Sequence, residues 1–203
     1  MSESPSVNKD RVLTCSVYCN GNKLGNEYTL VAATVHLELN RIGKATLKFN
    51  AGNMNKQTFD ESDADLFKPG NAIRLEVGDI EKENILFDGM IIGLRIITDK
   101  DFHSYMLVEC RDHAYSATQG RKNRIFEKKK DCDIIKEVLS AYGSVEVDST
   151  PYQYPTLVQY YCSDWDFALS RADANGLFIF TDGGKIKVKK PDVSTSPVLT
   201  VTY

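Results

Sequence analysis

Apolar and polar residues alternate through most of the first hundred residues, and this pattern constrains the fold more than any other feature of the chain. A period of two places successive side chains on opposite faces, which is typical of a strand with one buried face. The expected strands are 12–19, 28–39, 45–49, 72–77, 85–94, 95–98 and 105–111. Short strands at such close intervals predict an antiparallel β-barrel or β-sandwich, with the polar face of each strand meeting water or a partner.

Residues with turn chemistry separate these strands. Asn20-Gly21 is a strong hairpin signal, and Pro69-Gly70 marks another turn. The longest expected strand, Tyr28 to Leu39, places these apolar residues on one face: Val31, Ala33, Val35, Leu37 and Leu39. Between Met54 and Lys68 the composition shifts to Asp, Ser, Asn and Lys. We expect a loop there, with one short helix, over the mouth of the barrel.

The pattern changes after Tyr115. Residues 119–130 hold six basic side chains: Arg121, Lys122, Arg124, Lys128, Lys129 and Lys130. One interpretation is a phosphate-binding patch, and the other is a solvated connection between domains, anchored by Ile125 and Phe126. No aromatic stacking platform is interleaved with the basic residues, which favours the connection.

Two short helices are expected in the second half of the chain. Asp131 is expected to cap the first, whose apolar face comprises Ile134, Ile135, Val138, Leu139 and Tyr142. Ser163 is expected to cap the second, whose buried side comprises Trp165, Phe167, Ala168, Leu169 and Ala172. Asp164 and Asp166 lie where the helix dipole favours negative charge, and Gly176 suits a left-handed residue after the helix. Strands at 145–147, around 159, at 177–180 and at 186–188 make this region α+β.

The bulk properties exclude several classes of function. A net charge of −3 over 203 residues gives no basic footprint for nucleic acid. No apolar run approaches the length of a membrane span, and the polar first ten residues lack the apolar core of a classical signal peptide. Five cysteines (Cys15, Cys19, Cys110, Cys132 and Cys162) at scattered spacings indicate a reducing compartment and buried structural thiols.

Motifs that carry chemistry are missing from the sequence. None of the three histidines (His36, His103 and His113) has zinc-type spacing, and there is no Gly-x-Ser-x-Gly elbow. Arg111-Asp112-His113 falls at a strand end, where such residues usually form a turn with local hydrogen bonds. Capping and the helix dipole account for Asp164 and Asp166 without catalysis. We therefore predict no catalytic residue, no cofactor and no metal ligand, and we expect that the protein is not an enzyme.

Four short motifs resemble the VgrG spike proteins of type VI secretion and the related phage tail hubs of the late control protein D family. They are Phe87-Asp88-Gly89-Met90-Ile91, Arg124-Ile125-Phe126, the helix from Asp133 to Leu139, and the stretch from Gln159-Tyr160 to Gly176. Cys162 and Ala168 depart from the usual pattern of the last motif. The family-motif residues, to which a structural role is assigned, are Phe87, Gly89, Arg124, Phe126, Ile134, Leu139, Gln159, Tyr160, Ser163, Asp164, Asp166, Phe167, Leu169, Arg171 and Gly176.

The resemblance implies a mainly β, α+β fold like a phage baseplate hub: an antiparallel tube-type β-barrel followed by a small α/β domain. The implied parts are a flexible arm at 1–11, a first tube barrel at 12–117, an α/β insertion at 118–192 and the first strand of a second, truncated barrel at 193–203. It implies a hub that trimerises in the full-length protein and docks on a hexameric, Hcp-like tube protein. Effectors and chaperone or adaptor proteins are further implied partners, with no nucleic acid and no membrane span.

The same resemblance implies that the protein resides in the bacterial cytoplasm before firing and leaves through the contractile machine without a signal peptide. The apolar run Pro197 to Tyr203 lacks a partner strand after it, so we expect a fragment of a longer protein that is monomeric or weakly associated by itself. Three alternatives stay open: the hub of a phage tail or phage-like particle, a free ligand-binding β-barrel, and a hydrolase on a β-rich scaffold.

Overall fold

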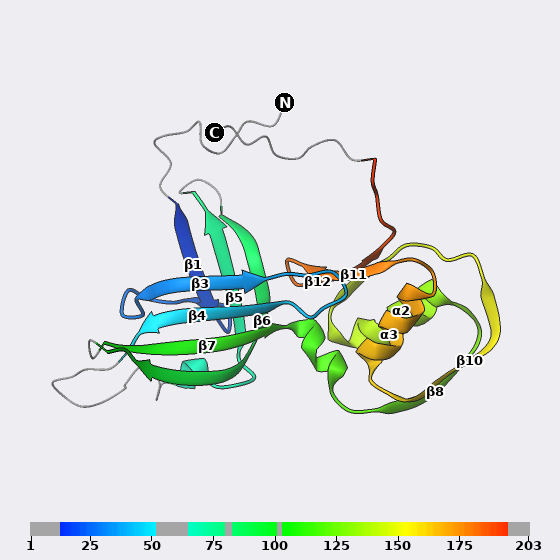
Figure 1. Cartoon of the computed structure of the whole chain (residues 1–203), viewed down its shortest axis with the longest axis horizontal. Coiled ribbons are helices and arrows are strands. Elements are labelled where there is room, and N and C mark those ends of the chain that lie inside the picture. Colours follow the sequence, from blue (N-terminus) through cyan, green and yellow to red (C-terminus); the bar gives the residue numbers. More distant parts are fainter. Residues whose placement is uncertain (1–12, 52–64, 80–82, 101–102, 195–203) are drawn as a thin grey trace.

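The computed structural model describes residues 13–51, 65–79, 83–100 and 103–194 of the chain. Its first part is a sheet of seven strands: β1 (Thr14–Cys19), β2 (Asn22–Lys23), β3 (Leu30–His36), β4 (Lys44–Asn50), β5 (Ala72–Gly78), β6 (Glu83–Thr98) and β7 (Ser104–Asp112). The strand order is β2-β1-β5-β6-β7-β4-β3, and every ladder is antiparallel. Figure 1 shows that the sheet curls, so that β3, β4 and β7 cross over β1, β5 and β6.

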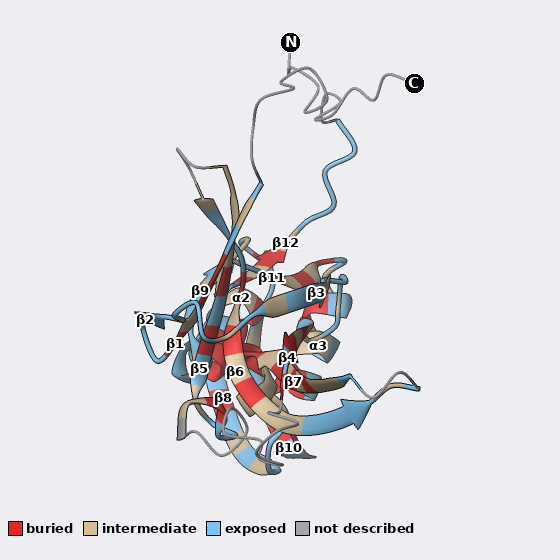
Figure 2. Ribbon diagram, turned by 90° about the vertical axis from the view of Figure 1, so that its left-hand side faces the viewer, coloured by how far each residue is buried: buried red, intermediate tan, exposed pale blue. Residues whose placement is uncertain are grey.

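Alternate residues of β1, β4, β5, β6 and β7 meet inside the curl, as the period of two predicts. For the edge strand β3 the prediction is wrong, since Val31 and Ala33 of the expected apolar face are exposed. The buried cluster comprises Val17, Cys19, Ala45, Leu47, Phe49, Ala51, Phe67, Ile73, Leu75, Phe87, Ile91, Met106, Val108 and Cys110, and Figure 2 shows buried positions in red along these strands. Burying one such large side chain contributes about 1.5–3 kcal/mol. The predicted hairpin at Asn20-Gly21 is confirmed, because both residues have positive φ (47° and 82°) and Cys19 pairs with Asn22.

Two strand boundaries predicted from the sequence are wrong. β3 ends at His36, and Leu37 and Leu39 are exposed, because the chain turns there to meet the second part of the molecule. Asn40 makes that contact: its backbone N–H donates to the carbonyl of Ile179 (2.6 Å), and its side-chain oxygen accepts from the Ile179 N–H (2.9 Å). Residues 85–94 and 95–98 form one continuous strand, β6, because β7 pairs with it along nearly its whole second half.

A groove of about 530 Å³ lies between the two edges of the curled sheet. β1 contributes Cys15 and Ser16 to its lining, and Leu30 of β3 lies opposite. In the described chain no ladder joins β3 to β1 or β2. Within the predicted loop at 54–68, the short helix η2 (Asp65–Phe67) is present and Phe67 is fully buried; residues 54–64 lie outside the described residues.

The second part surrounds two helices, α2 (Asp131–Leu139) and α3 (Asp164–Asp173). On one side lies a two-stranded antiparallel ribbon of β8 (Lys122–Lys130) and β10 (Gln153–Cys162). On the other lies a sheet in the order β11-β12-β9, where β12 (Lys185–Lys189) pairs antiparallel with β11 (Phe178–Asp182) and parallel with β9 (Ser144–Val147). Short 3₁₀ helices η3 (His113–Thr118) and η4 (Ser140–Tyr142) connect these elements (Figure 1).

Residues 119–130 are not a solvated connection, since most of them form β8. The expected anchor is half right: Phe126 is buried, but Ile125 is 69% exposed. Asp131 is the first residue of α2 and not its cap, because Lys130 holds that position without a side-chain hydrogen bond. The second helix is confirmed in detail, including the Ser163 cap and the left-handed Gly176 (φ 64°).

The predicted fold class is confirmed: the chain is mainly β, with a large antiparallel sheet followed by a smaller α/β part. The prediction of buried thiols holds for Cys19 and Cys110 only. Cys15 is exposed at the groove, Cys132 and Cys162 are half-buried, and all five are free. At the end of β7, Asp112 caps η3 by accepting from the N–H of Ala114 (2.9 Å), which is the local role predicted for that position.

Candidate functional site

Asp164 is the centre of a buried ion cluster formed by Lys122, Arg124, Tyr142, Gln159 and Asp164, called here the Asp164 cluster. Its Oδ2 accepts from Lys122 Nζ (2.6 Å), from the Tyr142 hydroxyl (2.6 Å) and from Arg124 Nη2 (3.3 Å). Its Oδ1 accepts from Gln159 Nε2 (2.9 Å) and lies 3.3 Å from Arg124 Nη1. The carboxylate side chain has no exposed area, so four side chains saturate it and no substrate can reach it.

Strand pairing and helix capping orient four members of this cluster: Lys122, Arg124, Gln159 and Asp164. Lys122 and Arg124 are two apart on β8 and therefore point to the same, inner face of the ribbon. Gln159 lies opposite Arg124 in the ladder with β10. Ser163 fixes Asp164 at the start of α3, because its Oγ accepts from the N–H of Asp166 (3.1 Å) and its hydroxyl donates to the Asp166 carboxylate (2.6 Å).

Contacts within the Asp164 cluster stabilise the ionised forms of Asp164 and Lys122. Burial alone would raise the pKa of Asp164, but hydrogen bonds from Gln159, Lys122 and Tyr142 and the charge of Arg124 outweigh it and lower that pKa. The hydrogen bond to Asp164 correspondingly raises the pKa of Lys122. Asp164 is therefore ionised at neutral pH and fastens the ribbon to α3 and η4.

Several other predicted site residues pack directly beneath this cluster. The rings of Phe126 and Phe167 stack at 5.7 Å between centroids with an angle of 12°, and Ile134 packs with them in a small apolar cluster. Leu139 is fully buried in the neighbouring cluster, against which Leu169 packs. These residues form the inner layer of the α/β part.

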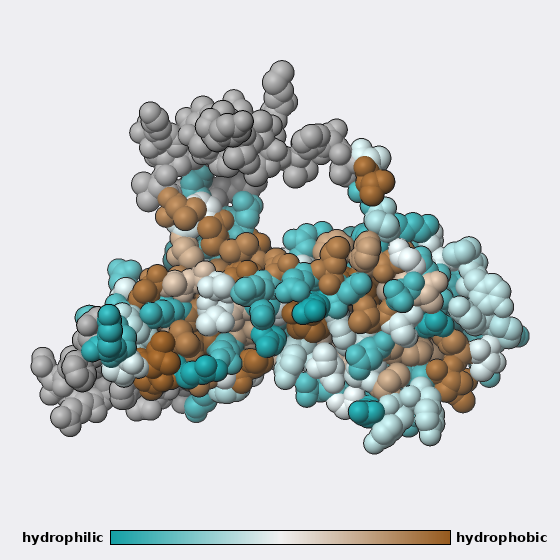
Figure 3. Space-filling model, viewed as in Figure 1, coloured by the Kyte–Doolittle hydropathy of each residue, from teal (hydrophilic) through white to brown (hydrophobic). Residues whose placement is uncertain are grey.

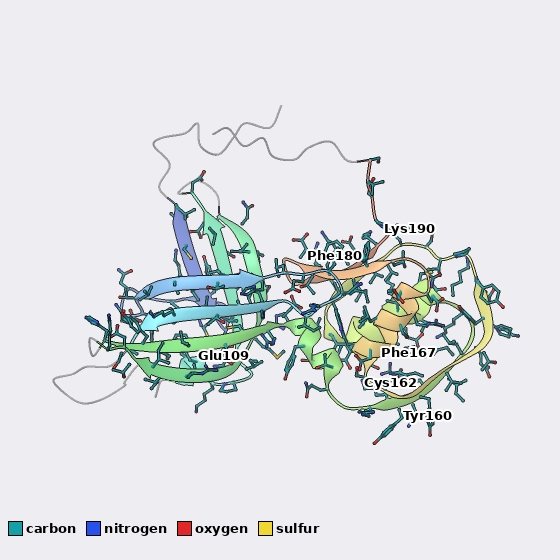
Figure 4. All side chains as sticks on the ribbon, in the orientation of Figure 1. Glu109, Tyr160, Cys162, Phe167, Phe180 and Lys190 are labelled. Atoms are coloured by element: carbon teal, nitrogen blue, oxygen red, sulfur yellow. The ribbon has the colours of Figure 1, made fainter. Side chains whose placement is uncertain are left out.

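Three predicted residues lie elsewhere. Phe87 and Gly89 belong to β6 in the curled sheet. A Cβ at Gly89 would stand 2.1 Å from the carbonyl oxygen of Arg111, so the glycine lets β6 and β7 approach closely. Tyr160 is 81% exposed, and Figure 4 shows its side chain pointing away from α3.

A second buried carboxylate was missed from the sequence. Asp131 is 1% exposed; Asn175 donates to its Oδ2 (2.8 Å), and Arg171 Nε lies 3.7 Å from its Oδ1. The helix-start position of Asp131 suggested only a cap. No sequence pattern indicates that Lys122 and Tyr142 belong to the Asp164 cluster. Lys122 falls in the run of basic residues, and Tyr142 falls on the predicted apolar face of a helix.

Polar contacts also join the curled sheet to the α/β part. Asp88 accepts from Arg74 Nη2 (3.1 Å) and lies 3.3 Å from His113 Nε2. The hydrogen bond with Asp88 raises the pKa of His113, whereas burial raises that of Asp112. Gly184, in the turn before β12, approaches Asp88 so closely that a Cβ would lie 3.1 Å from its Oδ2.

No group of three or more His, Cys, Asp or Glu side chains in the described ranges is arranged to hold a metal ion. The helices of those same ranges are all too short or too polar to cross a membrane.

Residues 9–203 match the family described as the Alg8 N-terminal domain. The chain belongs to this family. The match covers both the curled sheet and the α/β part. A search of curated proteins found no match.

Solved structures with the same fold are proteins of phage tails and of a secretion machine. A prophage MuSo2 43 kDa tail protein from Shewanella oneidensis superposes with a TM-score of 0.67 at 11% identity, over 88% of this chain and 53% of that one. A tail protein from Neisseria meningitidis MC58 gives 0.66 at 13%, over 92% and 53%. The E. coli c3393 protein, a component of the type VI secretion system, gives 0.61 at 14%, over 85% and 48%.

These similarities confirm, at the level of fold, the resemblance to VgrG and phage tail hubs that the four motifs indicated. The chain spans about half the length of these structures.

Proposed function

We propose that this chain is the N-terminal hub portion of the spike of a contractile injection machine, a structural part without an enzymatic reaction. In the full-length protein it trimerises and docks on a hexameric tube protein, so that the spike can puncture target cells and deliver effectors. The observation that carries the proposal is the shared fold over 85–92% of the chain with two tail proteins and a type VI secretion component. The domain limits proposed with it are a sheet domain at 12–117, an α/β domain at 118–192 and a second barrel that begins at 193.

The free edge of the curled sheet supports an assembling role. In the described chain β3 pairs with β4 alone, and its sequence (Leu-Val-Ala-Ala-Thr-Val-His) contains no Lys, Arg, Asp, Glu or Pro. Natural proteins usually block exposed edges with such residues, since an open edge invites pairing with another chain. We propose that β3, together with the segment 54–68, contacts a neighbouring copy or the tube ring.

The absence of reactive geometry at the best-ordered polar site is consistent with this role. Asp164 is saturated by its partners, and neither a serine, a cysteine nor a histidine is among them. The geometry of the Asp164 cluster suits a structural contact between the ribbon and α3 better than general acid or base catalysis, which needs a group within reach of substrate.

Co-purification tests the proposal. The full-length protein, tagged and co-expressed with the tube protein from the same gene neighbourhood, should elute with it and cap one end of tube assemblies in electron micrographs. A tube protein from a distant machine is the control and should not co-elute. Failure to bind the cognate tube protein would refute the docking role, and robust turnover in a hydrolase screen would favour an enzyme instead.

The hub of a phage tail or phage-like particle is a close alternative. It is favoured by the two tail proteins, whose TM-scores exceed that of the secretion component. The two functions differ in partners, so the identity of the tube protein that co-purifies decides between them.

A further inference from the structure

The outer face of the β8–β10 ribbon presents apolar side chains to solvent. The inner face packs on α2 and α3 through Phe126, whereas the cross-strand pair Ile125 and Val158 on the outer face is 69% and 50% exposed. Tyr160 adds an 81% exposed ring on the same strand as Val158. Figure 3 shows hydrophobic atoms gathered at the lower right, over this ribbon. These residues form a patch that nothing in the described chain covers.

Backbone irregularities enlarge that patch. In the part of the chain that the structure describes, four residues other than glycine have positive φ, and two of them are asparagines, which tolerate it. The other two, Lys128 (51°) and Tyr161 (47°), both belong to the ribbon. In a regular strand each would follow an outward residue and point inward, but both are exposed. The irregularities therefore add an ammonium group and a phenol ring to the solvent side of the ribbon.

The border of the patch carries more positive than negative charge, since exposed Glu127 of β8 is outnumbered by three exposed cations. Arg121 stacks over the ring of Tyr161 (5.1 Å to the centroid) and donates to its carbonyl oxygen, yet it has no carboxylate partner within the described residues. Lys128 and Lys130 are exposed and likewise form no ion pair with any described side chain. Lys129, by contrast, pairs with Glu137. An anionic segment with an apolar residue is the chemical complement of this surface.

The chain itself contains such a segment. Phe59-Asp60-Glu61-Ser62-Asp63-Ala64-Asp65 has four carboxylates in seven residues, an aromatic residue and no basic residue. In the sequence this segment follows β4, whose last residue, Asn50, pairs with Tyr105 of β7. The other end of β4, at Lys44, lies beside the α/β part, because a Cβ at the neighbouring Gly43 would stand 3.2 Å from the hydroxyl oxygen of Thr181 in β11.

The ribbon and the acidic segment therefore attach at opposite ends of the molecule, as Figure 1 shows for β4 and β8–β10. We propose that the outer face of the β8–β10 ribbon binds the segment 59–65 of a second copy of this chain. Contacts between two different surfaces are head-to-tail, and they close into a ring when the rotation between copies allows it. This inference deepens the proposed function, since it names the two surfaces through which copies of the hub meet.

Isotope-coded cross-linking tests the contact directly. A carbodiimide joins lysines to carboxylates at zero length, and an equimolar mixture of ¹⁴N and ¹⁵N chains identifies links between copies. We expect mixed-isotope links from Lys128 or Lys130 to Asp60, Glu61 or Asp63. Raising the salt from 0.1 to 1 M should suppress them several-fold, because the Debye length falls from about 10 to about 3 Å. Absence of these links, while other links between copies form, would overturn the proposal.

Charge reversal gives a sharper test of the head-to-tail geometry. Sedimentation velocity at high protein concentration measures the weak self-association that we expect of the native chain. The ribbon variant R121E/K128E/K130E and the segment variant D60K/E61K/D63K should each lose it. Their equimolar mixture should regain self-association, since the acidic ribbon of one variant again meets the basic segment of the other, while the native ribbon and the native segment pair as before. The control K44E/K185E/K190E reverses three other exposed lysines with the same change in net charge and should associate like the native chain.

Two further measurements distinguish loss of this contact from misfolding of the variants and from failure of the proposed function. Trp165 fluorescence and circular dichroism should show that each variant is folded. The ribbon variant of the full-length protein should still bind the tube protein, so loss of tube binding in the native protein would count against the proposed function alone. Self-association that the ribbon variant leaves unchanged would refute the contact while the hub role could stand.

Discussion

Replacing Asp164 by Asn is the most direct test of how the α/β part is held together. The substitution keeps the size of the side chain and removes its charge. Lys122 and Arg124 then lose their shared counter-charge, and the new amide N–H₂ faces donors where an acceptor stood. Removing one partner of a buried ion pair costs about 3–5 kcal/mol.

The two cations are not fully buried, which reduces that figure. The side chains of Lys122 and Arg124 are 36% and 34% exposed, so water can partly solvate them once Asp164 is neutral. The remaining amide oxygen can still accept from Tyr142 or Lys122. We therefore expect D164N to lower the free energy of unfolding by about 2–4 kcal/mol. For a chain of this size that corresponds to a fall in Tm of roughly 4–16 °C.

Urea unfolding followed by Trp165 fluorescence measures this effect where it arises. Trp165 is the one tryptophan of the sequence, is 5% exposed and directly follows Asp164. The matched control is D182N, which makes the same chemical change in an ion pair with Lys187 where the Asp182 side chain is 62% exposed. The control should lose less than about 1 kcal/mol, as exposed pairs do.

The difference between native protein and D164N should also depend on pH. The folded-state pKa of Asp164 lies below its ordinary value, so its contribution is fully present above the unfolded-state pKa of about 3.9 and is lost as the pH falls through the folded-state pKa. The gap in stability should be constant from pH 5 to 8 and narrow below about pH 4. A gap no larger than that of D182N at pH 7, with native circular dichroism, would refute the role given to the Asp164 cluster.

Three further outcomes are expected. G89A should destabilise the protein by about 1–3 kcal/mol in urea unfolding, because its Cβ would stand 2.1 Å from a β7 carbonyl oxygen. G93A should be tolerated sterically, since the nearest side-chain atom would lie 4.0 Å from its Cβ. The hydrogen bond to Asp88 raises the pKa of His113, so His113 should stabilise the fold. This stabilisation should be fully present below about pH 6.5 and be lost as the pH rises through the folded-state pKa. Comparing the free energy of unfolding of H113Q with that of the native protein from pH 5.5 to 8.5 measures it. K128G should raise the free energy of unfolding by up to about 1 kcal/mol, because glycine adopts the positive φ without strain.

Each of these outcomes has a control on the same element or of the same type. E127G, next to Lys128 but at an ordinary strand position, should lose about 0.5–1 kcal/mol. H36Q makes the same substitution on the exposed edge strand β3 and should change the free energy of unfolding by less than about 0.5 kcal/mol. Equal effects of G89A and G93A, or a loss of stability in K128G that matches E127G, would contradict the reasoning for those positions.

The parts of the fold that the sequence predicts are those governed by neighbours along the chain. Period two assigned Leu47 and Leu75 to the buried face, because successive side chains of a strand must alternate. The Ser163 cap and the Asn20-Gly21 hairpin were predictable for the same reason, since each depends on residues at most three positions apart.

The Asp164 cluster depends instead on distant residues. Asp164 meets Tyr142, Arg124 and Lys122 across 22, 40 and 42 positions of sequence, and no local pattern marks those meetings. β8 was missed for a related reason. Its run of basic residues has little apolar alternation of its own, and it is a strand because β10 pairs with it along its length. Tertiary pairing overrides local composition in both cases.

The junction between the two parts is built as a rigid connection, which bears on what the molecule can do. Asn40 forms hydrogen bonds with both backbone groups of Ile179 in β11, as a residue of a neighbouring strand would. The Asp88 carboxylate packs closely against Gly184. These contacts come from separate places in the curled sheet, the turn after β3 and the strand β6, so a hinge would have to break both together. A load on the ribbon would then pass through the Asp164 cluster and this junction to the sheet, as the proposed role between tube and spike requires.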